Sequence, residues 1–217
     1  MDESCESVLE FWFQRPAADA TELAAKMKRW YQGGAELDTE IVARFRGEVE
    51  AAVAGGLEAW LDKPKGWLAL ILLLDQFTRN VFRGDPRTYA GDPRALALAH
   101  RALDEGWHAG LTVEERNFAL MPLLHSEDLA SQERAVAEMP RLVADAPEPL
   151  RAIFGMGIEQ TRKYRDIIQR FGRFPHRNRL LGRPSTPEEE EFAAHFAERQ
   201  APSAARALFA GSGEPDR

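Results

Sequence analysis

The sequence predicts an all-α protein built from antiparallel helix pairs. Apolar side chains recur at helical spacing in nearly every segment, and helix-capping signals precede many of those segments. No segment shows the alternation of apolar and polar residues that is typical of a half-buried strand. Because the expected helices are joined by short turns, neighbours in the sequence should pack antiparallel. The pair formed by residues 93–106 and 112–139 has the size of a helical repeat unit, although no consensus of about 34 residues recurs.

Four helices are expected in the first part of the chain. Ser7 and Glu10 form a capping box for the first helix, and glycine pairs close the second and the third. The fourth has Pro64 in its first turn, followed by the apolar run WLALILLL. The predicted starts are Ser7, Asp19, Asp38 and Asp62, and the predicted ends are Pro16, Gly33, Gly55 and Phe82.

The rest of the chain repeats these signals. Asp85 and Pro86 predict a turn, and two further capping boxes open helices. The predicted segments are a helix capped by Asp92 that ends at Gly106, a helix from Thr112 to about Met139 that bends or restarts at Pro122, a proline-rich joint from Pro140 to Pro149, a long helix through Tyr164 to Gly172, a short helix from Pro175 to Gly182, and a helix opened by Thr186 and Glu189 that ends before Pro202.

Length and composition favour one domain. The 217 residues, of which 44% are hydrophobic, suffice for one sizeable core. We expect a single helical domain at 1–200 and a partly disordered tail at 201–217. The longest apolar run, Trp67 to Leu74, is far shorter than the roughly 20 residues of a membrane-spanning helix, and no secretory signal opens the chain. A cytoplasmic protein is therefore predicted, in which the single cysteine, Cys5, forms no internal disulfide.

A carboxylate and a guanidinium interrupt the apolar face of the fourth predicted helix. Asp75 and Arg79 share a helical stripe with buried-type residues such as Leu72. Unpaired charges would be costly there, so the two side chains are expected to be buried and paired with each other. In the functional alternative, Asp75 orients Arg79 toward a ligand, with Gln76 and Asn80 beside them.

His125 also lies on an apolar stripe, with Asp128 three residues further along the chain. This spacing suits a general base held by a carboxylate, although a hydrogen-bonded core histidine is the simpler interpretation and no nucleophile follows from the spacing. Glu127 is about 200° around the helix from His125, so the three side chains cannot ligate one ion together. The sequence predicts no metal site and no cofactor.

One segment is strongly basic although the chain carries a net charge of -7. Residues 170–183, RFGRFPHRNRLLGR, contain five arginines and one histidine but no acid. A short helix opened by Pro175 would gather free backbone N–H groups and basic side chains around an anion. In the alternative, the arginines pair with acids of neighbouring helices. The overall acidity argues against nucleic-acid binding. The ligand-binding candidates in this segment are Arg173, His176, Arg177 and Asn178.

Three long motifs resemble one bacterial family. LALILLLDQFTRNVFRG, LMPLLHSEDLASQE and YRDIIQRFGRFPHRNRLLGRPSTPEEEEF, with the opening VLEFWF, are similar to the family catalogued as domain of unknown function 924. The resemblance spans about Val8 to Phe192 and implies a TPR-like, right-handed superhelical stack without an established activity. The family's characteristic positions are matched here at Asp75, Gln76, Arg79, Asn80, His125, Ser126, Glu127, Asp128, Gln132 and 171–178.

Two positions depart from the family's pattern. Thr78 stands where the family usually has proline, and Tyr164 stands where it usually has histidine. A tyrosine can supply a hydroxyl but not a base near neutral pH, so the sequence predicts no general base at this position. The residues expected to support the ligand-binding groups are Asp75, Gln76, Glu127, Asp128, Gln132 and Tyr164.

Three hypotheses follow for function. The leading one is a helical binding module whose anion site takes an acidic peptide or a small carboxylate or phosphate ligand. The alternative is an enzyme acting on a small phosphorylated or carboxylated metabolite, with His125 as acid and base and with Arg79, Arg173 and Arg177 binding the anion. The third makes these groups a structural network. A long open groove would favour the peptide, and a small pocket with His125 near the arginines would favour the enzyme. In either functional case, segments 75–80, 125–132 and 170–178 should meet in space.

Overall fold

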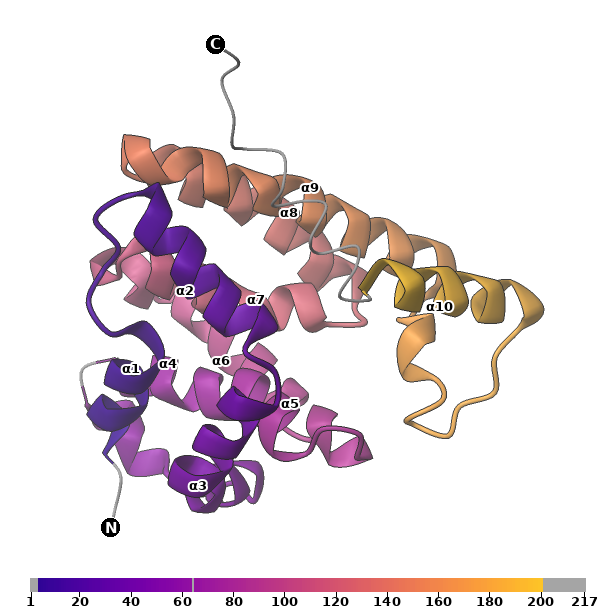
Figure 1. Ribbon diagram of the computed structural model, residues 1–217, viewed down its shortest axis with the longest axis horizontal. Helices are drawn as coiled ribbons and strands as arrows, with labels where there is room; N and C mark the ends of the chain where they lie inside the picture. The colour runs from indigo at the N-terminus through magenta and orange to yellow at the C-terminus, as the bar shows by residue number, and fades with distance from the viewer. Residues whose placement is uncertain (1–3, 64, 201–217) are drawn as a thin grey trace.

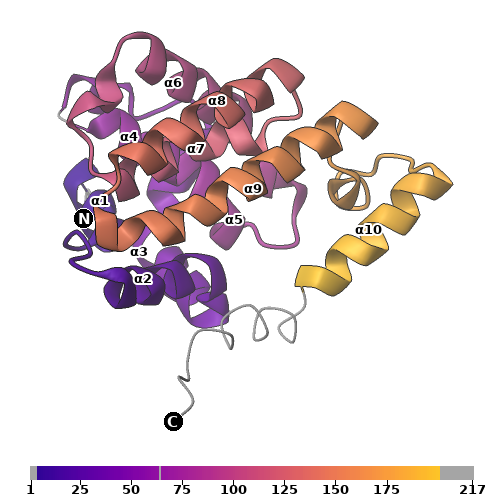
Figure 2. The ribbon, with the colours of Figure 1, turned by 90° about the horizontal axis from the view of Figure 1, so that it is seen from above.

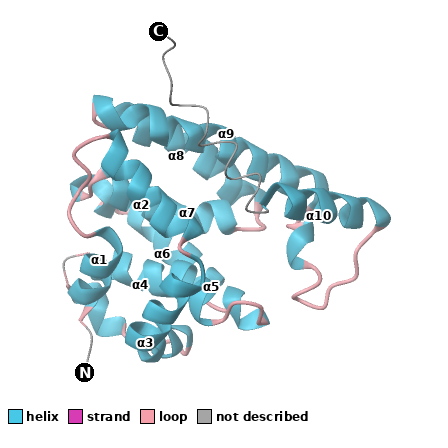
Figure 3. Cartoon of the chain, viewed as in Figure 1, coloured by secondary structure: helices cyan, strands magenta, loops and turns pink. Residues whose placement is uncertain are grey.

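The computed structural model describes residues 4–63 and 65–200, and every regular element in these ranges is a helix, with no strand among them (Figure 3). The α-helices are α1 (Cys5–Phe13), α2 (Ala20–Gln32), α3 (Gly34–Val53), α4 (Gly66–Ile71), α5 (Thr78–Val81), α6 (Asp92–Asp104), α7 (Val113–His125), α8 (Leu129–Asp145), α9 (Glu148–Phe171) and α10 (Pro187–Gln200). A π-helical turn, Leu72–Phe77, joins α4 to α5, and 3₁₀ turns occupy Glu58–Asp62, Pro86–Tyr89, Trp107–Gly110 and Pro175–Arg177. The all-helical class predicted from sequence is confirmed.

Successive helices in the second half of the chain pack on one another. α6 packs on α7, α7 on α8 and α8 on α9, and the long α9 also contacts α2 near the other end of the sequence (Figure 1). α10 stands apart from this stack and contacts the Pro175–Arg177 turn (Figure 2). The arginine-rich segment thus links the stack to its last helix.

The helix from α4 through α5 lies at the centre of the fold. The whole run from Trp67 to Leu74 is buried, as expected for a helix that is apolar on every side. Phe77 continues it into an aromatic cluster in which its ring lies 5.3 Å from Trp12 and 5.3 Å from Phe45, measured between centroids. The polar side chains of this central helix therefore sit against the main core.

Several predicted helix ends are confirmed. The side chain of Asp19 caps α2 by accepting a hydrogen bond from the backbone N–H of Glu22. Both capping boxes in the second half form, with Thr112 opening α7 and Thr186 preceding α10. α9 ends at Gly172, whose φ of 67° is readily adopted only without a side chain.

Four predicted helix starts are wrong: another side chain caps α1, and α3, α4 and α6 begin without a side-chain cap. Ser4, not Ser7, caps α1. α3 begins at Gly34, so Asp38 lies inside the helix and is free to pair with α5. Asp62 ends a 3₁₀ turn, and α4 starts only at Gly66, where a Cβ atom would lie 1.8 Å from the carbonyl oxygen of Trp60. Asp92 is the first residue of α6 rather than its cap.

The predicted course of residues 112–182 also needs correction. α7 passes through Pro122 and stops at His125, and α8 restarts after Asp128 and passes through Pro140 to Asp145. Buried residues continue at helical spacing on both sides of Pro140, so packing outweighs its missing N–H. The short helix predicted from Pro175 to Gly182 is only a 3₁₀ turn. The predicted roles of Pro64 and of the tail at 201–217 lie outside the described residues.

Candidate functional site

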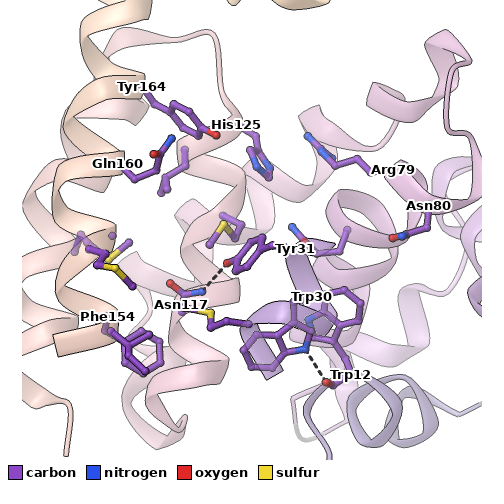
Figure 4. Close-up of a pocket in the computed structure, with 18 of the residues that line it drawn as sticks. Trp12, Trp30, Tyr31, Arg79, Asn80, Asn117, His125, Phe154, Gln160 and Tyr164 are labelled. Atoms are coloured by element: carbon purple, nitrogen blue, oxygen red, sulfur yellow. Dashed lines mark hydrogen bonds between the residues drawn. The ribbon is translucent and has the colours of Figure 1, made fainter. Parts of the chain in front are cut away.

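Two adjoining cavities open beside the central helix. The first has a volume of about 530 Å³ and the second about 480 Å³, which is the size range of small-molecule sites. Figure 4 shows His125, Arg79 and Tyr164 along one side of the first cavity, with Phe154, Trp30 and Trp12 across from them. Both cavities are lined by Arg79, Arg83, His125 and Tyr164. These four side chains form the boundary between the cavities.

His125 is held at this boundary by a buried carboxylate. Its Nδ1 atom lies 2.7 Å from Oδ1 of Asp75, which is completely buried, whereas the imidazole is partly exposed. An ionised carboxylate only accepts hydrogen bonds, so the Nδ1 atom must carry the proton. The Nε2 atom is therefore the ring nitrogen left for a ligand, and the hydrogen bond to Asp75 fixes the orientation of the ring.

The π-helical turn places Asp75 opposite His125. One wider turn inside an α-helix changes the direction of the side chains that follow, and such turns are frequent at functional sites. Here the turn contains Asp75 and Gln76, and Arg79 follows in the first turn of α5. Gln76 donates a hydrogen bond from Nε2 to Oδ2 of Asp75, and Arg79 donates to the backbone oxygen of Asp75.

Asp92, at the start of α6, binds two arginines at once. Its Oδ1 atom lies 3.0 Å from Arg79, and its Oδ2 atom lies 3.4 Å from NH1 of Arg177. Arg177 also donates from NH2 to the backbone oxygen of His125, at 2.9 Å. Segments 75–80, 125–132 and 170–178 therefore meet in space, and Asp92 contributes a fourth segment that the sequence did not single out.

Aromatic rings hold the guanidinium of Arg177. Its carbon atom lies 4.6 Å from the ring centroid of Tyr89 and 4.5 Å from that of Phe174. The side chain is only 9% exposed, so most of its hydration has been replaced by aromatic faces and by Asp92. Its Nε atom is buried without a hydrogen-bond partner among the described residues.

The pKa values of Asp75 and Asp92, the two acids behind the boundary, are shifted in opposite directions. Burial opposes ionisation of Asp75, but the charge of Arg79 and the hydrogen bonds from His125 and Gln76 outweigh it, so the pKa of Asp75 lies well below its usual range. Burial raises the pKa of Asp92, and Arg79 offsets this only in part. The site thus holds one firmly ionised carboxylate next to one that accepts a proton more readily.

His176 remains neutral over a wide pH range. Burial, together with the neighbouring charge of Arg177, lowers the pKa of His176 to about 4. Its ring stacks on Phe196 with 4.3 Å between centroids, and its Nδ1 atom has no hydrogen-bond partner in the described part of the chain. The second cavity is therefore lined by a neutral histidine as well as by arginines.

Several predicted site residues support the site from outside the cavities. Asp128 does not hold His125, because helix α7 ends between them; it caps α8 by accepting hydrogen bonds from the N–H and hydroxyl of Ser131. Gln132 donates to the backbone oxygens of Leu124 and Ser126 and so fixes the turn after α7. These contacts hold His125 at the end of its helix.

Most of the arginine-rich segment is held by acids. Arg173 forms a two-pronged pair with Glu189 at 2.7 and 2.9 Å and does not line either cavity. Glu127 accepts hydrogen bonds from Arg183 and from the backbone N–H of Phe174. Asn178 is fully buried and bonds Ser185 and Arg183. For these residues the predicted ion-pair and structural network accounts for the contacts observed.

Sequence reasoning missed part of the site. The sequence predicts both Asp92 and Asp38 as helix caps. In the structure Asp92 pairs with Arg79 and Arg177, and Asp38 accepts from Asn80 at 2.7 Å and from Arg83. In the sequence both are acids at a predicted helix start, and this position does not indicate a partner elsewhere in the fold. The apolar wall of the first cavity comes from α1, α2, α7, α8 and α9 and has no local signature.

Two further properties concern metals and membranes. Within 4–63 and 65–200, no three histidine, cysteine, aspartate or glutamate side chains are grouped so that they could hold a metal ion. None of the helices in these ranges has the length and apolar character needed to cross a bilayer.

The chain is similar to proteins of unknown function. Residues 8–196 match a family described as "Bacterial protein of unknown function (DUF924)". A solved structure from Agrobacterium tumefaciens, described as the protein of unknown function ATU0120, is 34% identical to this chain and superposes on it with a TM-score of 0.71. The match covers 88% of this chain and 97% of that one. No curated protein is significantly similar to the chain.

Proposed function

The chain belongs to the DUF924 family, and on the geometry of its own residues we propose that it is an enzyme acting on a small molecule that bears a carboxylate or phosphate. The observation that carries this proposal is the Asp75–His125 pair, 2.7 Å apart, at the boundary of two small cavities beside Arg79 and Arg177. In this proposal His125 is the general acid and base, and Asp75 is its positioning residue.

The pair suits proton transfer. With Nδ1 bonded to Asp75, the Nε2 atom can take a proton from a substrate in the cavity and return it. The imidazolium formed in this step would be stabilised by the buried negative charge of Asp75. The same fixed geometry orients the ring before the substrate arrives, which reduces the entropic cost of reaching the transition state.

Arg79 is the proposed first contact for the anion, because it lines both cavities and is 23% exposed. Arg177 would act with it from the second cavity. Asp92 now neutralises both arginines, so a ligand anion has to compete with Asp92 for them. The raised pKa of Asp92 lowers the cost of protonating it, and anion binding should therefore take up a proton and weaken as the pH rises.

An acidic peptide remains the second candidate ligand. It is favoured by the contiguity of the two cavities, which share four lining residues and together could take an extended segment. Cavities of about 530 and 480 Å³ suit a small molecule better, and Arg170 and Arg173 outside them are already paired with acids. We also propose that the stack is TPR-like, which the sequential packing of α6 to α9 supports.

Turnover of anionic substrates tests the enzyme proposal. Wild-type protein is incubated with pooled carboxylate esters, phosphate esters and anionic metabolites, and products are followed by mass spectrometry. We expect a reaction that falls about 100-fold or more in His125→Ala, in line with the usual contribution of a general base. Asp75→Asn should also slow the reaction and alter its pH profile. Equal turnover by wild type and His125→Ala would contradict the assignment of His125. Binding of acidic peptides to the protein, without turnover of any small molecule, would contradict the enzyme proposal.

A further inference from the structure

The first cavity has a wall that the proposed acid-base chemistry does not use. Beyond the shared boundary, the lining side chains are mainly aromatic and sulfur-containing: Trp12, Trp30, Phe154, Met27, Met121 and Met139. Methionine is flexible and polarisable, so such a wall can adjust to apolar groups of different shapes. The second cavity has no methionine in its lining, and there three arginines and two histidines lie among aromatic rings such as those of Tyr89, Phe174 and Phe196.

Two exposed apolar side chains border the same cavity. Tyr31 is 53% exposed and Met156 is 59% exposed, and each lines the first cavity from a different helix, α2 and α9. Exposed apolar side chains that are scattered singly need no partner, but these two border the same cavity and add to its apolar surface. Figure 4 shows Tyr31 within the cavity, with Asn117 donating to its hydroxyl at 3.4 Å.

We propose that the ligand of this site is an amphipathic acid whose apolar body fills the first cavity while its anionic head lies at Arg79 and His125. This inference rests on the proposed function for the head and adds the class of the rest of the molecule. Arg79 supplies the complementary charge at the point where the apolar wall ends. The two cavities then divide the ligand, with an apolar part on one side of His125 and a polar part on the other.

α9 offers a matched pair of substitutions at the wall. Gly157 lines the first cavity, and a Cβ atom there would lie 3.2 Å from the sulfur of Met139 at the end of a flexible side chain. Gly155, in the same helix, is not part of the lining, and a Cβ atom there meets nothing within 4 Å. Gly157→Leu should therefore fill the cavity, whereas Gly155→Leu makes the same chemical change outside it.

A chain-length series tests the inference. Acetate, butanoate, hexanoate and octanoate are titrated into the full-length protein by calorimetry. We expect affinity to rise roughly threefold to fourfold per added methylene until the cavity is filled, as burial of hydrocarbon predicts. Gly157→Leu should bind acetate like wild type but lose the dependence on length, and Gly155→Leu should retain both.

The outcomes separate this inference from the proposed function. Acetate binding with no gain from longer chains in wild type would overturn the amphipathic ligand and leave the anion site standing. Length-dependent binding that is unchanged in Arg79→Gln would support the apolar cavity but contradict the placement of the head. Should Gly157→Leu not fold, the chain-length series on wild-type protein alone still shows whether longer chains bind more tightly, and its failure to do so overturns the inference.

Discussion

Arg173 and Arg177 lie four residues apart in the same basic segment, yet their surroundings differ completely. Arg173 is 30% exposed and grips Glu189 with two nitrogen atoms. Arg177 is 9% exposed, lies against the rings of Tyr89 and Phe174, and shares Asp92 with Arg79. One side chain fastens α10 to the fold, and the other lines a cavity. A dense run of arginines is therefore not one electrostatic patch, and the function of each depends on its partner.

The largest expected effect is on stability at the cavity. Arg79→Ala leaves the buried carboxylate of Asp75 without its main counter-charge, so we expect a loss of about 3 kcal/mol or more in the free energy of unfolding. The matched control is Arg170→Ala, whose pair with Glu188 is exposed and should be worth at most about 1 kcal/mol. Chemical denaturation measures both. Equal losses of unfolding free energy in the two variants would contradict the distinction between cavity arginines and surface arginines.

A second effect should appear on acidification. The pKa of His176 is about 4 in the folded protein, against 6.5 for the free side chain. The unfolded chain therefore binds the extra proton first, and stability should fall as the pH drops from about 6.5 to 4, by at most about 3 kcal/mol. Unfolding curves across this range, compared between wild type and His176→Phe, measure the contribution. A pH dependence that survives unchanged in the variant would assign it to other groups.

Anion binding should distinguish the two arginines directly. Arg177→Gln should weaken phosphate binding by about tenfold or more, since a charge near the ligand is removed, whereas Arg173→Gln should change it less than about twofold. Calorimetric titration at several salt concentrations measures this, and the wild-type affinity should fall as salt rises. A larger loss of phosphate affinity in Arg173→Gln than in Arg177→Gln would contradict the distinction between the two arginines.

The smallest expected effect is that of metal removal. Among the residues that the structure describes, His125 has no set of neighbours that could complete a metal site, so a chelator should leave the melting temperature unchanged. Elemental analysis of protein purified without added metal is the complementary measurement. Stoichiometric zinc or iron, together with a large fall in melting temperature on chelation, would show that a metal site had been overlooked.

Local sequence signals predicted the helices better than the contacts between them. Capping boxes such as Thr112 with Glu115 depend on neighbouring residues and formed as expected. Asp128 and Asp92 were misassigned because their carboxylates can serve either a nearby N–H group or a distant arginine. Only the fold decides between such partners.

The sequence also predicted that the polar groups of the three segments would meet in space. Asp75, Arg79 and His125 interrupt apolar stripes, and charged groups on buried faces need partners. The partner of His125 could not be deduced, because Asp75 is fifty residues away in the chain and reaches it from a π-helical turn. The apolar cavity wall left no signal, because its methionines and aromatics resemble ordinary core residues.

The central claim is that an anion binds beside the Nε2 atom of His125 while Asp75 holds Nδ1. Nuclear magnetic resonance of the protein with ¹⁵N-labelled histidine rings, titrated with acetate, tests it most directly. We predict that Nδ1 stays protonated, that the Nε2 signal of His125 shifts saturably, and that the shift is lost in Arg79→Gln but kept in Arg173→Gln. A His125 ring that does not respond to saturating acetate, or that responds equally in both variants, would contradict the account.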